Sequence, residues 1–394
     1  MTHVTSTRSR RWLVFGLLLA GTTLGLAGTD LVLPAITVLP DALGGSAALA
    51  QGVLAAYVAG AGAGLVGFGE LGARFDQRNL LVASLLVFAG LSLMAPLASD
   101  MNTLIALRFL QGAAGAAAAV YAPGMIKALF EERDAVHALG VLGSIESVIP
   151  ALAPVAGVWL LAQLGWSGSF TVTGVLALLA SGVLLAARSV FPAMTSRRGA
   201  GGYSRLARDP VFARYALSQA FTLGGLLTFV FGAPVVMTEA MGGSLTHFVT
   251  MQISGIACFV IASNLTSRLS ERYGAETLVM VGSWLSAAGC LSTVLYALSG
   301  VGDPAWLALL FIPVNVGLGL RGPPGFYRAV LAAKGNESRG SALVLLAILL
   351  TAALGTVAAA PFVTTGLLPL ALIASGIAAL SPVVLMVLPA LNER

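Results

Sequence analysis

The stretch WLVFGLLLAGTTLGLAGTDLVLPAITVL, residues 12–39, contains one charged side chain, Asp30, among apolar, small and hydroxyl-bearing residues. A run of this length can cross the hydrocarbon core of a bilayer as a helix, which needs about 20 residues. A carboxylate inside such a helix costs about 2.5 to 3.5 kcal/mol on insertion scales. We therefore expect a functional role for Asp30, with helix capping or bending beside Pro34 as the alternative.

The composition of the whole chain is that of a polytopic membrane protein. Of its 394 residues, 58% are hydrophobic and 9% are charged, and the mean hydropathy is +0.94. Soluble globular domains contain about 25% charged residues. The net charge of +5 does not indicate a nucleic-acid partner, because the basic residues lie in short gaps between apolar runs. The N-terminus resembles a signal peptide, but further apolar runs follow it, and we expect an uncleaved first span.

Apolar runs of spanning length are each expected to form a helix, because lipid offers no partners for unpaired backbone groups. The twelve predicted spans are residues 12–39, 47–68, 79–98, 102–127, 135–161, 167–188, 211–237, 245–267, 276–298, 304–326, 339–363 and 367–390. The longest polar stretch separates the first six from the last six. We expect an N-terminal bundle (1–190), a cytoplasmic linker (191–210) and a C-terminal bundle (211–394), although the linker charges also fit a helix lying on anionic lipid.

The basic residues predict the orientation of the chain. With a cytoplasmic N-terminus, 20 of the 21 Lys and Arg fall in inner segments, Arg321 among them, and the outer loops carry only acids. This asymmetry follows the positive-inside rule and places both termini in the cytoplasm. The remaining basic residue, Arg108, lies within the fourth predicted span.

The two halves of the chain repeat at an offset of 198 residues. The segment GELGARFDQR, residues 69–78, returns as SRLSERYGAE, residues 267–276, and the Gly-Gly-Ser at 44–46 returns at 242–244. Two parallel halves with a site between them near the bilayer midplane are a transporter architecture. The predicted fold is therefore all-α, with twelve transmembrane helices in two pseudo-symmetric halves.

Two further charges lie within the predicted spans. Arg108 and Asp30 have depths that agree within about 5 Å at 1.5 Å per residue, so they can pair. A guanidinium keeps its proton and needs an anion or carbonyl partner in lipid; a structural ion pair or a snorkelling side chain is the alternative role.

Glu146, Pro150 and Pro154 recur every four residues in the fifth predicted span, and so they share one face of it. The prolines predict a bend at which two conformations can differ. Glu146 is a candidate second proton site, a partner for Arg108 or an anchor for a cationic substrate. A protonated acid hydrogen-bonded to backbone is the alternative.

Several short motifs resemble the major facilitator superfamily, and within it the twelve-span drug:proton antiporters of the Bcr/CflA kind. Asp30 with Pro34 resembles the group's Asp-x-x-x-Pro. The other matching segments, in chain order, are AYVAG (56–60), RFLQG (108–112), PALAPVAG (150–157), GWSGSF (165–170) and FGAPVV (231–236). The chain departs from the family at Ala73, where the family has an Asp that helps to lock one conformation; Glu70 or Asp76 can substitute. Thr22 and Thr23 stand where some relatives have a second acid, which makes a dedicated dicationic specificity less expected.

The resemblance implies roles for particular residues. Proton coupling is assigned to Asp30, Arg108 and Glu146, substrate binding to Tyr57, Gln111, Gln219, Thr228 and Asn315, and gating to Arg74, Arg78, Pro150, Pro154 and Gly157. The residues assigned to substrate in the second half fit interhelical hydrogen bonds equally well. The histidines, cysteines and carboxylates have neither metal-ligand nor nucleophile spacing, so we expect no metal, no cofactor and no enzyme activity.

The function expected from this resemblance is proton-coupled export of small, largely apolar drugs by alternating access, which would contribute to antibiotic resistance. We expect the protein to act as a monomer in the inner membrane. An exporter of a polar metabolite such as a sugar or siderophore is the alternative within transport. A membrane-embedded transferase is the alternative from another class, and the short outer loops argue against it.

Overall fold

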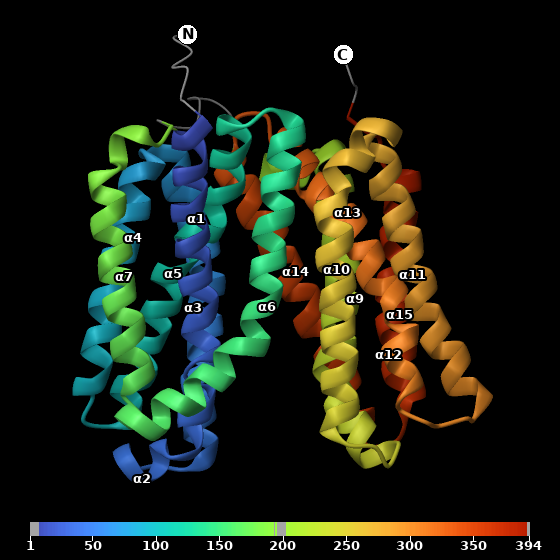
Figure 1. The fold of residues 1–394 in the computed structure, drawn as a ribbon, viewed down its shortest axis with the longest axis horizontal. Helices are drawn as coiled ribbons and strands as arrows, with labels where there is room; N and C mark the ends of the chain where they lie inside the picture. The colour runs from blue at the N-terminus through green and yellow to red at the C-terminus, as the bar shows by residue number, and fades with distance from the viewer. Residues whose placement is uncertain (1–7, 193, 195–201, 392–394) are drawn as a thin grey trace. The chain divides into compact units, whose positions relative to one another are not determined.

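The computed structural model describes residues 8–192, 194 and 202–391, and the regular structure in these residues is helical (Figure 1). Eleven of the helices are long and apolar enough to span a membrane, and the two segments of one bent helix make a twelfth. The prediction of twelve spans is thereby confirmed. The long helices are α1 (Arg8–Asp30), α3 (Ala47–Arg74), α4 (Gln77–Met94), α5 (Met101–Leu129), α6 (Glu132–Leu164), α7 (Gly168–Ala186), α9 (Pro210–Val235), α10 (Leu245–Tyr273), α11 (Ala275–Ser299), α13 (Ile312–Ala332), α14 (Glu337–Ala359) and α15 (Leu367–Val387).

Polar residues in the short connections cap the long apolar helices. Asp100 accepts the Thr103 backbone N–H at 2.9 Å at the start of α5. Asp209 precedes Pro210 and accepts two backbone N–H groups of the first turn of α9, those of Val211 and Phe212. These caps satisfy donors that the first turn of a helix cannot. Of the predicted linker, residues 193 and 195–201 lie outside the described residues; the remainder includes the short helix α8 (Tyr203–Ala207).

The chain divides into two units that interleave in sequence. Unit 1 comprises Met1–Phe130, Ile145–Ala200 and Gly335–Ala342, and unit 2 comprises Glu131–Ser144, Gly201–Lys334 and Leu343–Arg394. Helix α6 therefore begins in unit 2 and continues in unit 1, whereas α14 begins in unit 1 and continues in unit 2.

Helix pairing within each unit agrees with the sequence repeat. In unit 1, α3 packs on α5, and in unit 2 the corresponding helices α10 and α13 pack together. Regular helix also ends at a proline in both first helices: α1 gives way to the 3-10 turn η1 (Leu33–Thr37) at Pro34, and α9 gives way to the π-turn η4 (Val236–Ala240) after Pro234.

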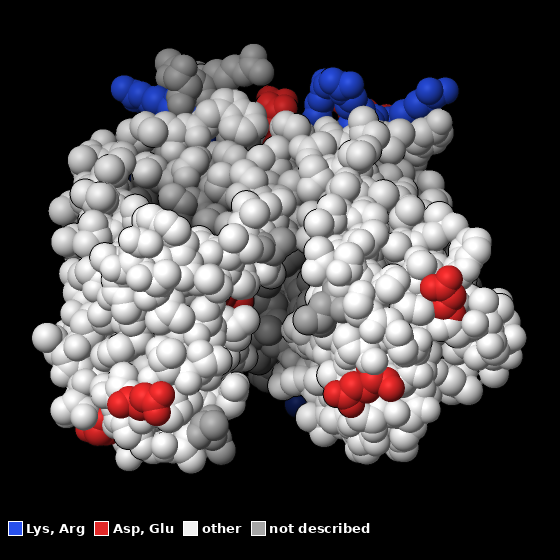
Figure 2. Space-filling view, turned by 60° about the horizontal axis from the view of Figure 1, so that its bottom comes forward, with Lys and Arg blue, Asp and Glu red and all other residues white. Residues whose placement is uncertain are grey.

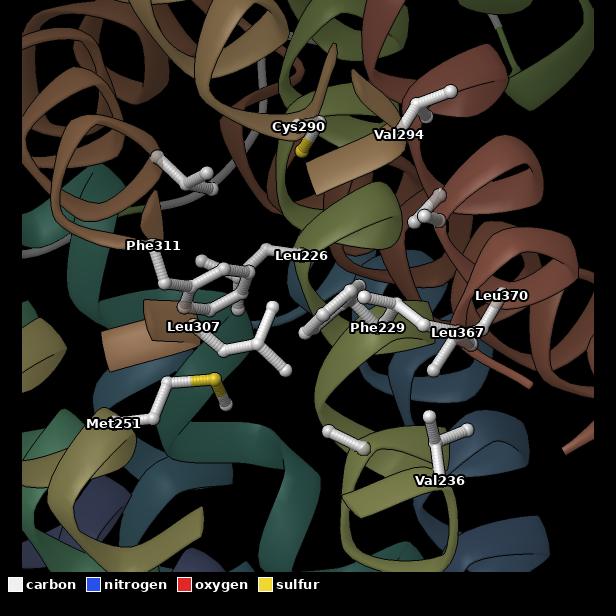
Figure 3. Packing of buried hydrophobic residues seen from close by; sticks show 14 of the residues in the cluster. Leu226, Phe229, Val236, Met251, Cys290, Val294, Leu307, Phe311, Leu367 and Leu370 are labelled. Atoms are coloured by element: carbon white, nitrogen blue, oxygen red, sulfur yellow. The ribbon is translucent and has the colours of Figure 1, made fainter. Parts of the chain in front are cut away.

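The hydrophobic core of unit 2 lies between α9, α10, α11, α13 and α15 (Figure 3). Phe229 and Phe311 stack with ring centroids 4.9 Å apart, and Cys290 is a buried free thiol in the same cluster. In each unit, Lys and Arg side chains gather at one end of the helices, and acidic side chains mark the opposite end (Figure 2). This distribution is the one that the positive-inside pattern predicts.

Candidate functional site

Arg108 lies in α5 with its side chain fully buried, at 0% exposure. Its Nη1 donates to the Gly28 carbonyl at 2.9 Å and to Oε1 of Gln111 at 2.8 Å. Its Nε lies 3.4 Å from the Val53 carbonyl oxygen, and the guanidinium carbon lies 4.1 Å from the centre of the Tyr57 ring. Carbonyl dipoles, an amide oxygen and an aromatic face thus stabilise the positive charge.

The two side chains that hold Arg108 are themselves anchored. The Tyr57 hydroxyl donates to the Gly25 carbonyl at 2.5 Å, and Nε2 of Gln111 donates to Oγ of Ser92 at 2.5 Å. Tyr57 and Gln111 are both buried. In this conformation they fix the orientation of Arg108, and their contact with substrate stays a prediction.

Glycines in α3 and α5 bring the two backbones into contact. A Cβ on Gly112 would lie 2.0 Å from the Tyr57 carbonyl oxygen, and a Cβ on Gly60 would lie 1.9 Å from the Phe109 carbonyl oxygen. Any side chain at these positions would push the helices apart. The close approach places the ring of Tyr57 over Arg108, so the glycines have a structural role in the site.

Asp30 is the last residue of α1 and is partly exposed. Among the described residues it has no ion pair within 4.0 Å, so the expected pair with Arg108 is not formed in this conformation. The reason lies in the helix end: Val32 N–H bonds to Thr29 at 3.3 Å, which leaves the Gly28 carbonyl without its usual helical donor. Arg108 takes that carbonyl, two residues before the acid.

Glu146 lies on α6, with its side chain close to Thr22 of α1. Thr22 is buried, whereas Glu146 is partly exposed. Arg108, which was considered as a partner for this acid, bonds to other groups in this conformation, and Thr22 lies beside the acid instead. Thr22, beside Glu146, lies eight residues before Asp30 along α1. That spacing corresponds to about 12 Å at 1.5 Å per residue.

Helix α6 is bent by 45° between its segments Glu132–Pro150 and Leu152–Leu164. Pro150 and Pro154 lie at and just beyond the bend, as expected for residues that remove helical hydrogen bonds. A Cβ on Gly157 would lie 2.4 Å from the Leu31 carbonyl oxygen, so the second segment packs closely on the end of α1. The bend predicted from the proline spacing is present, and its part in gating stays a prediction.

A charge network links the end of α3 to the start of α14 within unit 1. Glu70 pairs with Arg74 at 2.7 Å and with Arg339 at 2.9 Å, and the Ser338 hydroxyl donates to the Gly69 carbonyl at 3.1 Å. Glu70, one turn before Ala73, therefore makes the link to α14.

The other substitute considered for the missing Asp, Asp76, has a local role. It accepts the backbone N–H of Arg78 and pairs with the Arg78 guanidinium at 2.6 Å. The hydrogen bond from Arg78 lowers the pKa of Asp76 below its ordinary value. Arg74 and Arg78, both assigned to gating, are thus bound to separate acids.

The polar residues predicted to bind substrate in the second half are engaged in hydrogen bonds. Thr228 is buried and donates to the Gly224 carbonyl at 2.8 Å, and Asn315 donates to the Phe311 carbonyl at 3.0 Å. Both bonds run within the residue's own helix. Gln219 instead accepts from another helix, through Nη1 of Arg321 at 2.8 Å.

Arg321 is a buried charge that the sequence analysis assigned to an inner segment. It lies within the span Trp306–Ala332, its side chain is 0% exposed, and its partners are Gln219 and the hydroxyl of Ser218. The signal was present, because the predicted span 304–326 already contained this arginine. Because Arg321 was grouped with the basic residues of the inner loops, it was not recognised as a charge within a span.

The described residues form no group of three or more His, Cys, Asp and Glu side chains that could hold a metal ion. Twelve candidate spanning helices in repeated bundles, with charged side chains at membrane depth, are typical of a membrane transporter. Comparison with known proteins makes the class specific. The family profile of the Major Facilitator Superfamily matches residues 13–359, and the chain belongs to this family. It is a transporter rather than an enzyme.

Several relatives of this chain are named resistance proteins. The chain is 27% identical over 306 residues to the chloramphenicol resistance protein of Pseudomonas aeruginosa, covering 75% of this chain and 72% of that protein. It is 23% identical over 284 residues to a bicyclomycin resistance protein homologue of Haemophilus influenzae, covering 70% and 71%. These matches agree with the resemblance to drug:proton antiporters that the motifs indicate.

Solved structures share the fold at low sequence identity. An outward-facing bacterial homologue of the iron transporter ferroportin matches with a TM-score of 0.75 at 14% identity, over 95% of this chain and 98% of that one. The transporter FucP in its outward conformation matches with a TM-score of 0.72 at 15% identity, over 96% and 99%. Both confirm the major facilitator fold.

Proposed function

We propose that this protein exports small, largely apolar toxic compounds across the inner membrane in exchange for inward-moving protons, by alternating access. The observation that carries the proposal is Asp30, an acid within a spanning segment that has no ion-pair partner among the described residues. An intramembrane acid without a counter-charge is suited to bind and release a proton. The resistance proteins among the relatives support drugs as the cargo.

Each group of unit 1 has a part in the proposed cycle. Asp30 takes up the proton, and its position at the end of α1 lets it respond to rearrangement of the turn at Pro34. Arg108, bonded two residues away at Gly28, supplies a fixed positive charge. Glu146 with Thr22 is the candidate for a second proton or a cationic cargo group. Both termini are proposed to be cytoplasmic.

An exporter of a polar metabolite, such as a sugar, remains the second candidate. Such a cargo needs amides and hydroxyls that can bind it. In unit 2, however, Thr228 and Asn315 donate to carbonyls of their own helices. The engagement of these groups within the bundle favours an apolar cargo.

The driving force sets how export should respond to voltage. A proton that enters under one pH unit and about 100 mV releases about 1.4 plus about 2.3 kcal/mol, which supports a gradient of about 500-fold for a neutral compound exchanged one for one. For a monovalent cation the voltage contribution cancels, and about tenfold remains. We expect dissipation of voltage alone to impair export of neutral compounds more than of monocations. Equal impairment would contradict one-proton exchange.

The direct test is transport in sealed vesicles with an imposed pH gradient, screened over neutral and cationic drugs. Wild type should move drug against proton flow, and Asp30→Asn should still bind drug but lose active export and proton release. Asp41→Asn, at an exposed acid of the predicted outer side, is the matched control and should export normally. Purified Asp30→Asn that releases protons on drug binding with wild-type stoichiometry would move the proton site to Glu146.

A further inference from the structure

Arg321 in α13 carries a buried positive charge whose partners among the described residues are neutral. Nη1 donates to Oε1 of Gln219 at 2.8 Å, Nη2 donates to Oγ of Ser218 at 3.0 Å, and Nε has no hydrogen-bond partner among the described residues. A guanidinium at membrane depth keeps its charge and needs anion or carbonyl acceptors for its N–H groups. The two neutral acceptors of Arg321 leave its Nε–H without one in the described part of the chain.

The nearby acid of unit 2 is committed to other cations. Glu276, at the start of α11, pairs with Arg214, accepts the hydroxyl of Tyr215 at 2.8 Å and lies 3.7 Å from Arg328. This end of the unit therefore has an excess of guanidinium groups over carboxylates. The resulting positive potential favours entry of an anion toward Arg321.

The α13 backbone approaches the Arg321–Gln219 pair closely at Gly325. A Cβ on Gly325 would lie 3.2 Å from Nη2 of Arg321 and 3.3 Å from Oε1 of Gln219, so a side chain there would crowd the pair. The same turn contains Pro323 and Pro324. Pro323 cannot bond to the carbonyl four residues earlier, at Gly319, and the Thr266 hydroxyl donates to it instead at 3.0 Å. The helix continues through this Gly-Pro-Pro-Gly segment beside the charge.

We propose that Arg321, Gln219 and Ser218 form an anion-binding site in unit 2, beside Gly325, that takes a single negative charge. The charge comes from a chloride ion or from the carboxylate of a transported compound. Either anion would accept from the Nε and Nη groups in a charge-assisted hydrogen bond, which is the strong kind in a buried setting. The site is separate from Asp30 and Arg108 and goes beyond the proposed exchange of drug for protons.

The test uses the purified full chain in detergent at constant ionic strength, with methanesulfonate as the balancing anion. Thermal stability is titrated with sodium chloride and, separately, with sodium benzoate. We expect a saturable rise in Tm in the wild type. A response to chloride identifies an inorganic anion, and a response to benzoate alone identifies a carboxylate of the cargo.

Two glycine variants provide the matched comparison. Gly325→Ala should weaken the apparent affinity at least about tenfold, as expected when a charge-assisted contact is blocked. Gly322→Ala should behave as wild type, because a Cβ there meets nothing within 4 Å. Arg321→Gln should lose the rise in Tm with added anion. If Arg321→Gln fails to fold, the comparison of Gly325→Ala with Gly322→Ala tests the site. No saturable response to either anion, or equal affinity in the two glycine variants, would overturn the site. Because the readout needs no transport, its failure is distinguishable from failure of export.

Discussion

Arg108 and Arg321 show how this protein buries a guanidinium without a carboxylate. Each is 0% exposed and donates to the side-chain oxygen of a glutamine, Gln111 in unit 1 and Gln219 in unit 2. Arg108 also has two carbonyl oxygens and an aromatic face, whereas Arg321 has one hydroxyl. Arg108, which has more hydrogen-bond acceptors than Arg321, lies next to the proposed proton site at Asp30. A positive charge held in place there can act on the proton affinity of the acid.

Replacing Arg108 by Ala should abolish active export, because the charge that binds the end of α1 is lost. It should also lower Tm, since Gln111 and the Gly28 carbonyl lose a buried donor, at about 1 to 3 kcal/mol for each group left unsatisfied. Arg108→Lys keeps the charge but not the forked geometry, and should be intermediate. The measurements are vesicle efflux and thermal unfolding. Wild-type efflux by folded Arg108→Ala would remove Arg108 from the mechanism.

Asp76 gives a pH dependence that can be measured outside the membrane. Its pKa is lowered by the hydrogen bond from Arg78, so its contribution to stability is complete above the ordinary Asp pKa of about 4 and is lost as the pH falls through the lowered value. Asp76→Asn keeps an N-cap for α4 and should flatten this acid-side loss of Tm. Asp76→Ala also loses the cap and should cost about 1 kcal/mol at pH 7. Identical acid-side melting curves for wild type and Asp76→Asn would contradict the assignment.

The types of the residues predicted which side chains belong to the site. Their depth in the membrane could not predict which of them pair. The sequence placed Asp30 and Arg108 at similar depths, but depth says nothing about the direction of a side chain around its helix axis. The end of α1 decided the partner, because the turn at Pro34 released the Gly28 carbonyl for Arg108. Glu146 likewise found Thr22 through the path of α6, which the sequence does not specify.

At the scale of helices, the contact of α3 with α5 has a sharp requirement for glycine. Gly112→Ala would place a methyl group 2.0 Å from the Tyr57 carbonyl oxygen, whereas Gly62→Ala in the facing helix would meet nothing within 4 Å. We expect Gly112→Ala to lose about 1 to 3 kcal/mol of stability and to impair export by shifting the Tyr57 ring. Gly62→Ala should keep the wild-type Tm. The comparison is thermal unfolding of both variants, and equal Tm values would show that the helices are less closely packed.

Hydropathy predicted the existence of every spanning helix, because the length of apolar runs is set by the bilayer. It did not predict where regular helix stops. The break in α6 near Pro150 was expected from its prolines, but the π-turn at Val236–Ala240 was not. A single inserted residue changes the backbone without changing the apolar pattern, so composition carries no trace of it.

At the scale of the whole molecule, charge asymmetry predicts which side of the membrane each segment meets. Residues 191–210 should be cleaved by protease only from the cytoplasmic side, because this segment contains Arg197, Arg198, Arg205 and Arg208. The assay compares intact cells with inside-out vesicles, and a protease site inserted beside the outer-side acid Asp303 is the control of opposite orientation. Cleavage of the 191–210 segment in intact cells would reverse the topology.

The first residues of α6 belong to unit 2 and those of α14 belong to unit 1, and this predicts how the chain behaves when it is produced as two fragments. Residues 131–144 belong to unit 2, where Ser263 donates to the Gly140 carbonyl at 3.2 Å and Asn264 donates to Ser144 at 3.0 Å. Residues 335–342 belong to unit 1, where Lys127 and Glu337 pair at 2.9 Å. A fragment that ends in the polar stretch after α7 would therefore lack partners that only the other fragment carries. Produced together, the two fragments should complement each other as a stable pair, and each produced alone should be degraded.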